Sequence, residues 1–217
     1  MIRRLTWMVA VGVLAGSAAW AQNARVELSG TAGWTFSDGV SGSAVIVPGV
    51  GTFDRIDPKD AFSWGARIGF LVSDNVEVGG LFSAQSTSLE LGGTNTAKLG
   101  DETIYNYHGY FAYNFGEADA QVRPYVLGGL GATQFGTVKT SVGDIGGNTK
   151  FSTTWAAGVK LYPSKNVGLR LEGRWTPTYI KSDAGGWWCD PYWGCYVVGN
   201  AQYANQFELS GGITLRF

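Results

Sequence analysis

The side chain best suited to acid–base chemistry in this chain is its single histidine, His108. A histidine that acts as a general base needs a hydroxyl nucleophile and an orienting acid within hydrogen-bond reach. Ser83 and Glu77 share the strand parity of His108, but the polar residues nearest to it in sequence are Asn106 and Tyr110. The pattern favours a histidine held in a structural polar network, and we expect no catalytic residues.

Cys189 and Cys195 are the only cysteines, and they enclose the turn signal Asp190-Pro191. In an exported protein, an even and closely spaced pair predicts a disulfide. The alternatives are two free thiols or half of a metal site. Because a second histidine is lacking, we expect neither a four-ligand metal site nor a cofactor.

Aromatic residues crowd the same segment. Two interpretations stay open: a surface contact with a ligand, since Tyr and Trp are enriched in binding hot spots, or a cap on the mouth of the fold at a membrane interface. The residues concerned are Trp187, Trp188, Tyr192, Trp193 and Tyr196.

Ten charged residues lie in stretches where apolar and polar residues alternate, and all ten occupy the polar positions of that alternation. A lipid-facing Arg or Lys at mid-membrane costs roughly 2–4 kcal/mol, which explains such sorting in a transmembrane barrel. We predict that the ten charges and His108 form a paired network inside a barrel. The ten are Glu27, Arg67, Glu77, Arg123, Lys160, Arg170, Glu172, Arg174, Glu208 and Arg216.

Eight stretches of period-two alternation position these residues. Four long connections alternate with three short turns, as in outer-membrane barrels. The predicted strands cover residues 25–36, 61–72, 76–87, 103–115, 122–135, 151–162, 167–179 and 204–217. A small hairpin in the first connection, which would make ten strands, is the alternative.

Residues 1–21 read as a secretory signal peptide, with Arg3 and Arg4 before a short apolar run and Ala19-Trp20-Ala21 as a cleavage site. The predicted barrel domain then covers residues 22–217. The formal net charge of −1 gives no indication of nucleic-acid binding. Aromatic residues make up 14% of the chain and charged residues 15%, which suits membrane-spanning strands.

Several motifs resemble the eight-stranded outer-membrane β-barrel family, which includes opacity-type proteins, the barrel domain of outer membrane protein A and other porin-like members. They are Arg123-Pro124-Tyr125 with Gly128, Gly129 and Gly131, then Gly158, then Leu169-Arg170-Leu171-Glu172 with Arg174, and a strand ending on Phe217. The resemblance implies an all-β, transmembrane, eight-stranded antiparallel up-and-down barrel in a Gram-negative cell outer membrane. It further implies extracellular loops, periplasmic termini, contact with lipopolysaccharide, and recognition of Phe217 by the barrel-assembly machinery.

The family carries several roles on one scaffold. We expect a monomeric structural or surface-interaction protein, adhesin-like, with an unknown surface ligand and an interior closed by the polar network. One alternative is a narrow pore or carrier for small or hydrophobic solutes, like outer membrane protein W. A weaker alternative is a lipid A-modifying enzyme, although the family's deacylase pattern, with His and Ser close together on one strand, is absent around His108.

Overall fold

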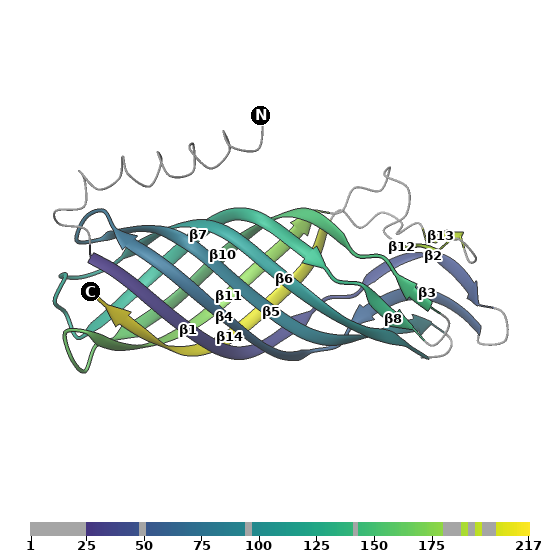
Figure 1. Ribbon diagram of the computed structural model, residues 1–217, viewed down its shortest axis with the longest axis horizontal. Helices are drawn as coiled ribbons and strands as arrows, with labels where there is room; N and C mark the ends of the chain where they lie inside the picture. The colour runs from purple at the N-terminus through teal and green to yellow at the C-terminus, as the bar shows by residue number, and fades with distance from the viewer. Residues whose placement is uncertain are drawn as a thin grey trace, which may run out of the picture.

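Eight long antiparallel strands close into a barrel, with each strand paired to its neighbours in sequence (Figure 1). A computed structural model describes residues 25–47, 51–93, 97–140, 143–179, 188–190, 194–196 and 203–217. The predicted all-β, up-and-down barrel is confirmed. Its strands are β1 (Arg25–Ser37), β4 (Ala61–Leu71), β5 (Val76–Gly93), β6 (Ala97–Asn114), β7 (Val122–Phe135), β10 (Asn148–Leu161), β11 (Val167–Tyr179) and β14 (Tyr203–Arg216).

The seam of the barrel joins the first strand to the last. The register of β1 against β14 runs from Glu27 opposite Arg216 to Ser37 opposite Gln206. Beyond it, Val26 N–H donates to Phe217 O at 3.2 Å, and Phe217 N–H donates to Val26 O at 2.9 Å. The seam leaves no unpaired edge in the barrel wall, which a strand structure in hydrocarbon requires.

The two faces of the wall are sorted opposite to those of a soluble barrel. Large apolar side chains are exposed on the outside, as in Trp64 (52%), Leu171 (54%) and Ile213 (56%). Charged side chains are buried inside, as in Arg123 (0%) and Lys160 (0%). Lipid is the solvent that stabilises this arrangement. Leu81 is an apolar residue at an inward position of its strand, and it is buried in the interior.

The prediction of a long loop over residues 88–102 is wrong. β5 and β6 continue as one paired hairpin as far as Leu91 opposite Ala97. The physical reason is that Leu89 and Leu91 maintain the period-two pattern and stay buried, although Gly92-Gly93 looks like a loop signal.

Short hairpins occupy the other three long connections. They are β2 (Val40–Val47) with β3 (Gly51–Pro58), β8 (Val138–Thr140) with β9 (Gly143–Ile145), and β12 (Trp188–Asp190) with β13 (Gly194–Tyr196). β3 pairs with β5, and β8 pairs with β6. The first hairpin therefore extends the wall beyond the barrel and does not add two strands to the closed barrel.

These extensions form what we call the outer sheet, with the order β2-β3-β5-β6-β8-β9. Within the described ranges, its two ends, β2 and β9, have no further ladder partner. The β12–β13 hairpin forms a separate sheet. It lies against both ends, with β13 beside β2 (Figure 1) and β12 beside β9. The outer sheet thus continues the barrel at what we call its long-loop end.

The opposite, short-turn end holds connections 72–75, 115–121 and 162–166. These turns are tied to one another and to the wall, for example by Asn75 Nδ2, which donates to Asn114 O at 2.7 Å and to Gly116 O at 2.8 Å. Within the described ranges, no helix is long and apolar enough to cross a membrane.

Candidate functional site

Inward-facing glycines make room for bulky polar side chains in the barrel interior. A Cβ added at Gly79 would overlap the carbonyl oxygen of Ile68 and lie 2.8 Å from the ring of Tyr110. A Cβ at Gly158 would lie 2.7 Å from the hydroxyl of Tyr125. The space beside these glycines is therefore occupied by aromatic neighbours.

An ionic cluster lies at the short-turn end of the interior. Lys160 Nζ lies 2.6 Å from Glu27 Oε2 and 2.5 Å from Glu77 Oε2, so one ammonium group joins two carboxylates. Glu27 also pairs with Arg216 Nη2 at 2.7 Å, and Arg170 Nη2 lies 3.6 Å from Glu27 Oε2. The buried charges are thus linked across strands that are far apart in sequence.

Three tyrosines complete this cluster. Tyr162 OH donates to Glu27 Oε1 at 2.9 Å, and Tyr110 OH donates to Glu77 Oε1 at 2.5 Å. Tyr125 OH donates to Glu172 Oε2 at 2.5 Å. The rings also lie under cations, with Arg216 4.1 Å from the Tyr162 centroid, a geometry that stabilises buried cations.

Two further ion pairs cross the interior. Arg67 Nη2 lies 2.8 Å from Glu172 Oε1. Arg174 Nη2 lies 2.5 Å from Glu208 Oε2, and it also donates to Ser83 Oγ at 2.9 Å. Removing one member of such a buried ion pair is costly, because the remaining charge is left without a partner in an environment that excludes water.

All eleven residues predicted for the interior network are buried there. Ten of them make a side-chain hydrogen bond or ion pair to another interior side chain, and Arg123 bonds a turn carbonyl. Sequence reasoning missed Tyr110, Tyr125 and Tyr162 as network members. Their inward parity was the available signal for all three.

A neutral layer of amides and hydroxyls lies on the long-loop side of the ion pairs. Thr133 Oγ1 donates to Asn106 Oδ1 at 2.7 Å and lies 2.9 Å from Ser152 Oγ. Gln206 Nε2 donates to Gln85 Oε1 at 3.0 Å, and Asn106 Nδ2 donates to Gln206 Oε1 at 3.3 Å. The layer connects five strands of the barrel without using a charge.

His108 belongs to this neutral layer. Its Nε2 lies 2.9 Å from Ser152 Oγ, a pair that the sequence did not reveal. Ser83, the hydroxyl considered from parity, instead accepts from Arg174. His108 Nδ1 has no hydrogen-bond partner among the described residues, so no acid orients the ring. The arrangement has a hydroxyl and an imidazole but not the third member of a catalytic triad.

An apolar layer lies beyond the neutral one, on strands β5, β6, β7 and β8. Leu89, Ile104 and Val138 are each 1% exposed, and Phe135 is also buried. Glu102 lies in the same region, and neither carboxylate oxygen has a hydrogen-bond partner among the described residues. Burial raises the pKa of Glu102 from 4.5 to about 8. This residue, assigned to a loop from the sequence, lies outside the predicted membrane-spanning strand of residues 103–115.

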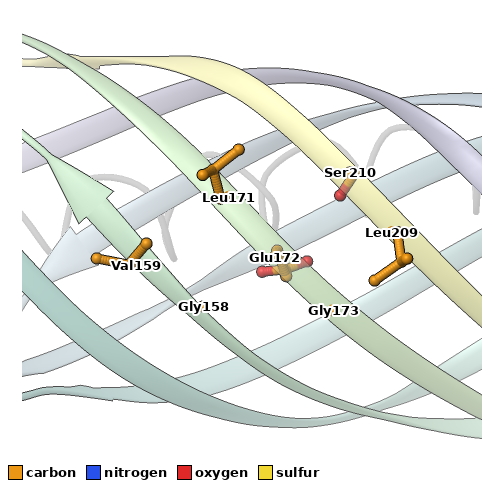
Figure 2. A pocket seen from close by; sticks show the side chains of 7 residues that line it. All are labelled: Gly158, Val159, Leu171, Glu172, Gly173, Leu209 and Ser210. Atoms are coloured by element: carbon orange, nitrogen blue, oxygen red, sulfur yellow. The ribbon is translucent and has the colours of Figure 1, made fainter.

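A shallow hollow opens on the outer, lipid-facing wall over β10, β11 and β14 (Figure 2). Its volume is about 500 Å³. The apolar side chains of Val159, Leu171 and Leu209 border it around Gly173 (Figure 2). Glu172 accepts a hydrogen bond from Arg67 in the interior. The two polar residues of its lining, Glu172 and Ser210, are buried, so the hollow offers a mainly apolar contact.

The predicted surface contact lies largely outside the described residues, as do Trp187, Tyr192, Trp193 and the predicted signal peptide of residues 1–21. Trp188 begins β12, and Tyr196 ends β13. The register of this hairpin places Cys189 directly opposite Cys195. Opposite residues of an antiparallel pair have Cα atoms about 4.5 to 5.5 Å apart, which is within the range that disulfides span. Among the described residues, no group of acidic, histidine or cysteine side chains gathers as a metal site requires.

Comparisons with known proteins agree with this architecture. A family model described as "Outer membrane protein beta-barrel domain" matches residues 7–214. Outer membrane porin F of Pseudomonas fluorescens is 33% identical over 113 residues, which are 52% of this chain and 33% of that protein. The match therefore spans about a third of the length of that relative.

Two solved structures share the fold. Neisserial surface protein A matches with a TM-score of 0.58 at 16% identity, covering 90% of this chain and 100% of that one. The outer membrane protein OprG of Pseudomonas aeruginosa matches with a TM-score of 0.58 at 11% identity, covering 89% and 95%. At these identities the likeness concerns the fold alone.

Proposed function

Because the chain belongs to the outer membrane protein beta-barrel domain family, we propose that it is a surface-interaction protein whose barrel is a closed support rather than a pore. In this arrangement the barrel spans the cell outer membrane, the outer sheet is extracellular, and the short turns are periplasmic. Lipopolysaccharide surrounds the outer half of the wall, and the barrel-assembly machinery recognises the last strand with Phe217.

The observation that carries this proposal is the sequence of three layers inside the barrel. An ion that crossed the interior would have to separate pairs such as Lys160–Glu77, with both side chains at most 1% exposed. It would then meet the apolar layer of Leu89, Ile104 and Val138, where a charge has no hydrogen-bonding partner. An eight-stranded barrel is only wide enough for its own side chains, so these layers favour a closed interior.

The outer sheet supplies the surface for interaction. It extends the wall by the strand pairs from Ser86 opposite Thr103 to Leu91 opposite Ala97, and its ends β2 and β9 are flanked by the β12–β13 hairpin. A rigid strand platform reduces the ordering cost of binding. The aromatic segment around Cys189 and Cys195 is the part we assign to ligand contact.

The histidine geometry argues against the enzyme alternative. His108 faces the interior, where it contacts Ser152, and no carboxylate in the part of the chain that the structure describes orients it. A lipid substrate would have to enter the packed interior to reach this pair.

Single-channel conductance of refolded protein in a planar bilayer tests the closed interior. We expect no steady conductance from the wild type, and openings from Arg174→Ala, which leaves Glu208 without its cation. Lys59→Ala, which removes a half-exposed ion pair with Glu90, is the matched control and should stay silent. Steady conductance in the wild type would replace the proposal by the narrow-pore alternative.

The interaction role has a separate test on bacterial cells that display the protein. A variant in which a Gly/Ser linker replaces residues 187–196 should insert normally but lose binding to glycan and extracellular-matrix arrays. Equal binding by both proteins would remove the aromatic segment as the contact surface.

A further inference from the structure

A row of aromatic side chains crosses three neighbouring strands of the outer wall, near the long-loop end of the barrel. Phe36 of β1 stands directly opposite Phe207 of β14, and Phe207 stands directly opposite Trp175 of β11. All three lie on the lipid-facing side of the wall, where each is nearly half exposed. The row therefore presents an aromatic surface at the level where a barrel meets the polar border of the membrane.

A hollow of about 250 Å³ opens beside this row, and Asp38 and Asn205 complete its lining. Asn205 holds both neighbours in place. Its Oδ1 accepts a hydrogen bond from Trp175 Nε1 at 3.2 Å, and its backbone oxygen accepts one from the Asp38 N–H at 2.9 Å. Asp38 is exposed, and among the described residues no cation pairs with its carboxylate. Aromatic rings beside an unpaired carboxylate attract a cationic group.

The apolar hollow of Figure 2 adjoins this one on the same face of β11 and β14. Gly173 stands opposite Leu209, and Trp175 and Phe207 follow and precede them by two positions on these strands. A Cβ added at Gly173 would lie 3.6 Å from the Leu209 side chain and 3.7 Å from the Phe207 ring. The two hollows therefore meet at Gly173 and form one groove, with a carboxylate at its long-loop end and apolar side chains toward the middle of the wall.

We propose that this groove binds one membrane lipid whose headgroup carries an ammonium group. The ammonium group lies against Asp38 and the aromatic row, and an acyl chain occupies the apolar hollow at Gly173. The charge of Asp38 selects a cationic headgroup and disfavours an anionic one, while the apolar part selects a ligand with a hydrocarbon chain. The site requires only that the wall faces lipid, whichever end of the barrel is extracellular, so its test is independent of the conductance experiment.

Native mass spectrometry of the refolded full chain, released from an uncharged detergent, tests the headgroup. The probes are phosphatidylethanolamine and phosphatidylglycerol with identical acyl chains, because both carry a phosphodiester and only the first carries an ammonium group. We expect the wild type to bind the first phosphatidylethanolamine roughly threefold or more tightly than the first phosphatidylglycerol. Asp38→Asn should lose this preference. Asp119→Asn, which removes the same charge from the connection 115–121 at the short-turn end, should keep it.

A second variant, Gly173→Leu, tests the acyl chain. Its side chain fills the apolar hollow, so it should weaken the binding of both lipids by a similar factor and leave the preference between them unchanged. Free ethanolamine, which has the ammonium group without a chain, should not displace phosphatidylethanolamine at an equal concentration. A heat-modifiability gel verifies that each variant is folded. The proposal is overturned if the wild type binds both lipids equally, if Asp38→Asn keeps the preference, if Gly173→Leu binds like the wild type, or if free ethanolamine displaces the lipid.

Discussion

Glu27 and Arg216 stand opposite each other in the seam that joins β1 to β14, and their side chains form an ion pair of 2.7 Å inside the barrel. They are separated by 189 positions in the chain. The same residue pair therefore closes the backbone ladder and anchors the ionic cluster, because Glu27 also accepts from Lys160 and Tyr162.

The first prediction concerns this anchor. Glu27→Gln should lower the free energy of unfolding by about 3 kcal/mol or more, since one-sided loss of a buried pair leaves its cations uncompensated. Urea unfolding in lipid vesicles measures the change. The control is Glu90→Gln, which removes the half-exposed pair with Lys59 and should cost less than about 1 kcal/mol. Equal losses from the two variants would contradict the proposed importance of the buried network.

A second prediction tests the packing of the interior. Gly79→Ala should strongly impair folding, because the added methyl group overlaps the Ile68 carbonyl and the Tyr110 ring. Gly30→Ala is the matched control, because a Cβ at this outward position meets nothing within 4 Å. The yield of folded protein on a heat-modifiability gel reports both. Normal folding of Gly79→Ala would mean that the interior is looser than the structure indicates.

The third prediction is a pH dependence that arises from Glu102. Its pKa in the folded protein is raised by burial to about 8, above the ordinary 4.5. Between these values the folded state keeps a proton that the unfolded state releases, so this carboxyl lowers stability as pH rises and has no further effect above about 8. Urea midpoints between pH 5 and pH 9 measure the slope.

Glu102→Gln removes the ionisable group and keeps its shape. This variant should lose that part of the slope and be more stable than the wild type at pH 9, whereas Glu90→Gln should retain the slope. Identical pH profiles for the wild type and Glu102→Gln would show that the carboxyl is not desolvated.

A fourth prediction concerns the β12–β13 hairpin, where Cys189 lies opposite Cys195. Protein refolded under oxidising conditions should resist alkylation until it is reduced, and mass spectrometry should then show two added groups. The double variant Cys189→Ser/Cys195→Ser should insert and fold normally, because the hairpin lies outside the barrel ladder. Alkylation of the unreduced protein would exclude the disulfide.

Local alternation was sufficient to predict the faces of the barrel. Arg170, Glu172 and Arg174 alternate with Leu169, Leu171 and Gly173. Because successive side chains of a strand point to opposite faces, the residue types of each strand show which face points into the barrel. The succession of strands with alternating long and short connections likewise predicted the up-and-down order and the pairing of β14 with β1. The extension of β5 and β6 was missed because Gly92-Gly93 and many small polar residues resemble a loop.

Only the tertiary structure decided which interior side chains meet. Parity placed His108 inside, but its contact with Ser152 depends on the stagger of β6, β7 and β10. Lys160 reaches Glu27 across 133 positions and Glu77 across 83, because closing a barrel tilts its strands and shifts their registers together. The alternation of each strand thus determined what lies inside, whereas the closed barrel determined the partners and the buried environment of Glu102.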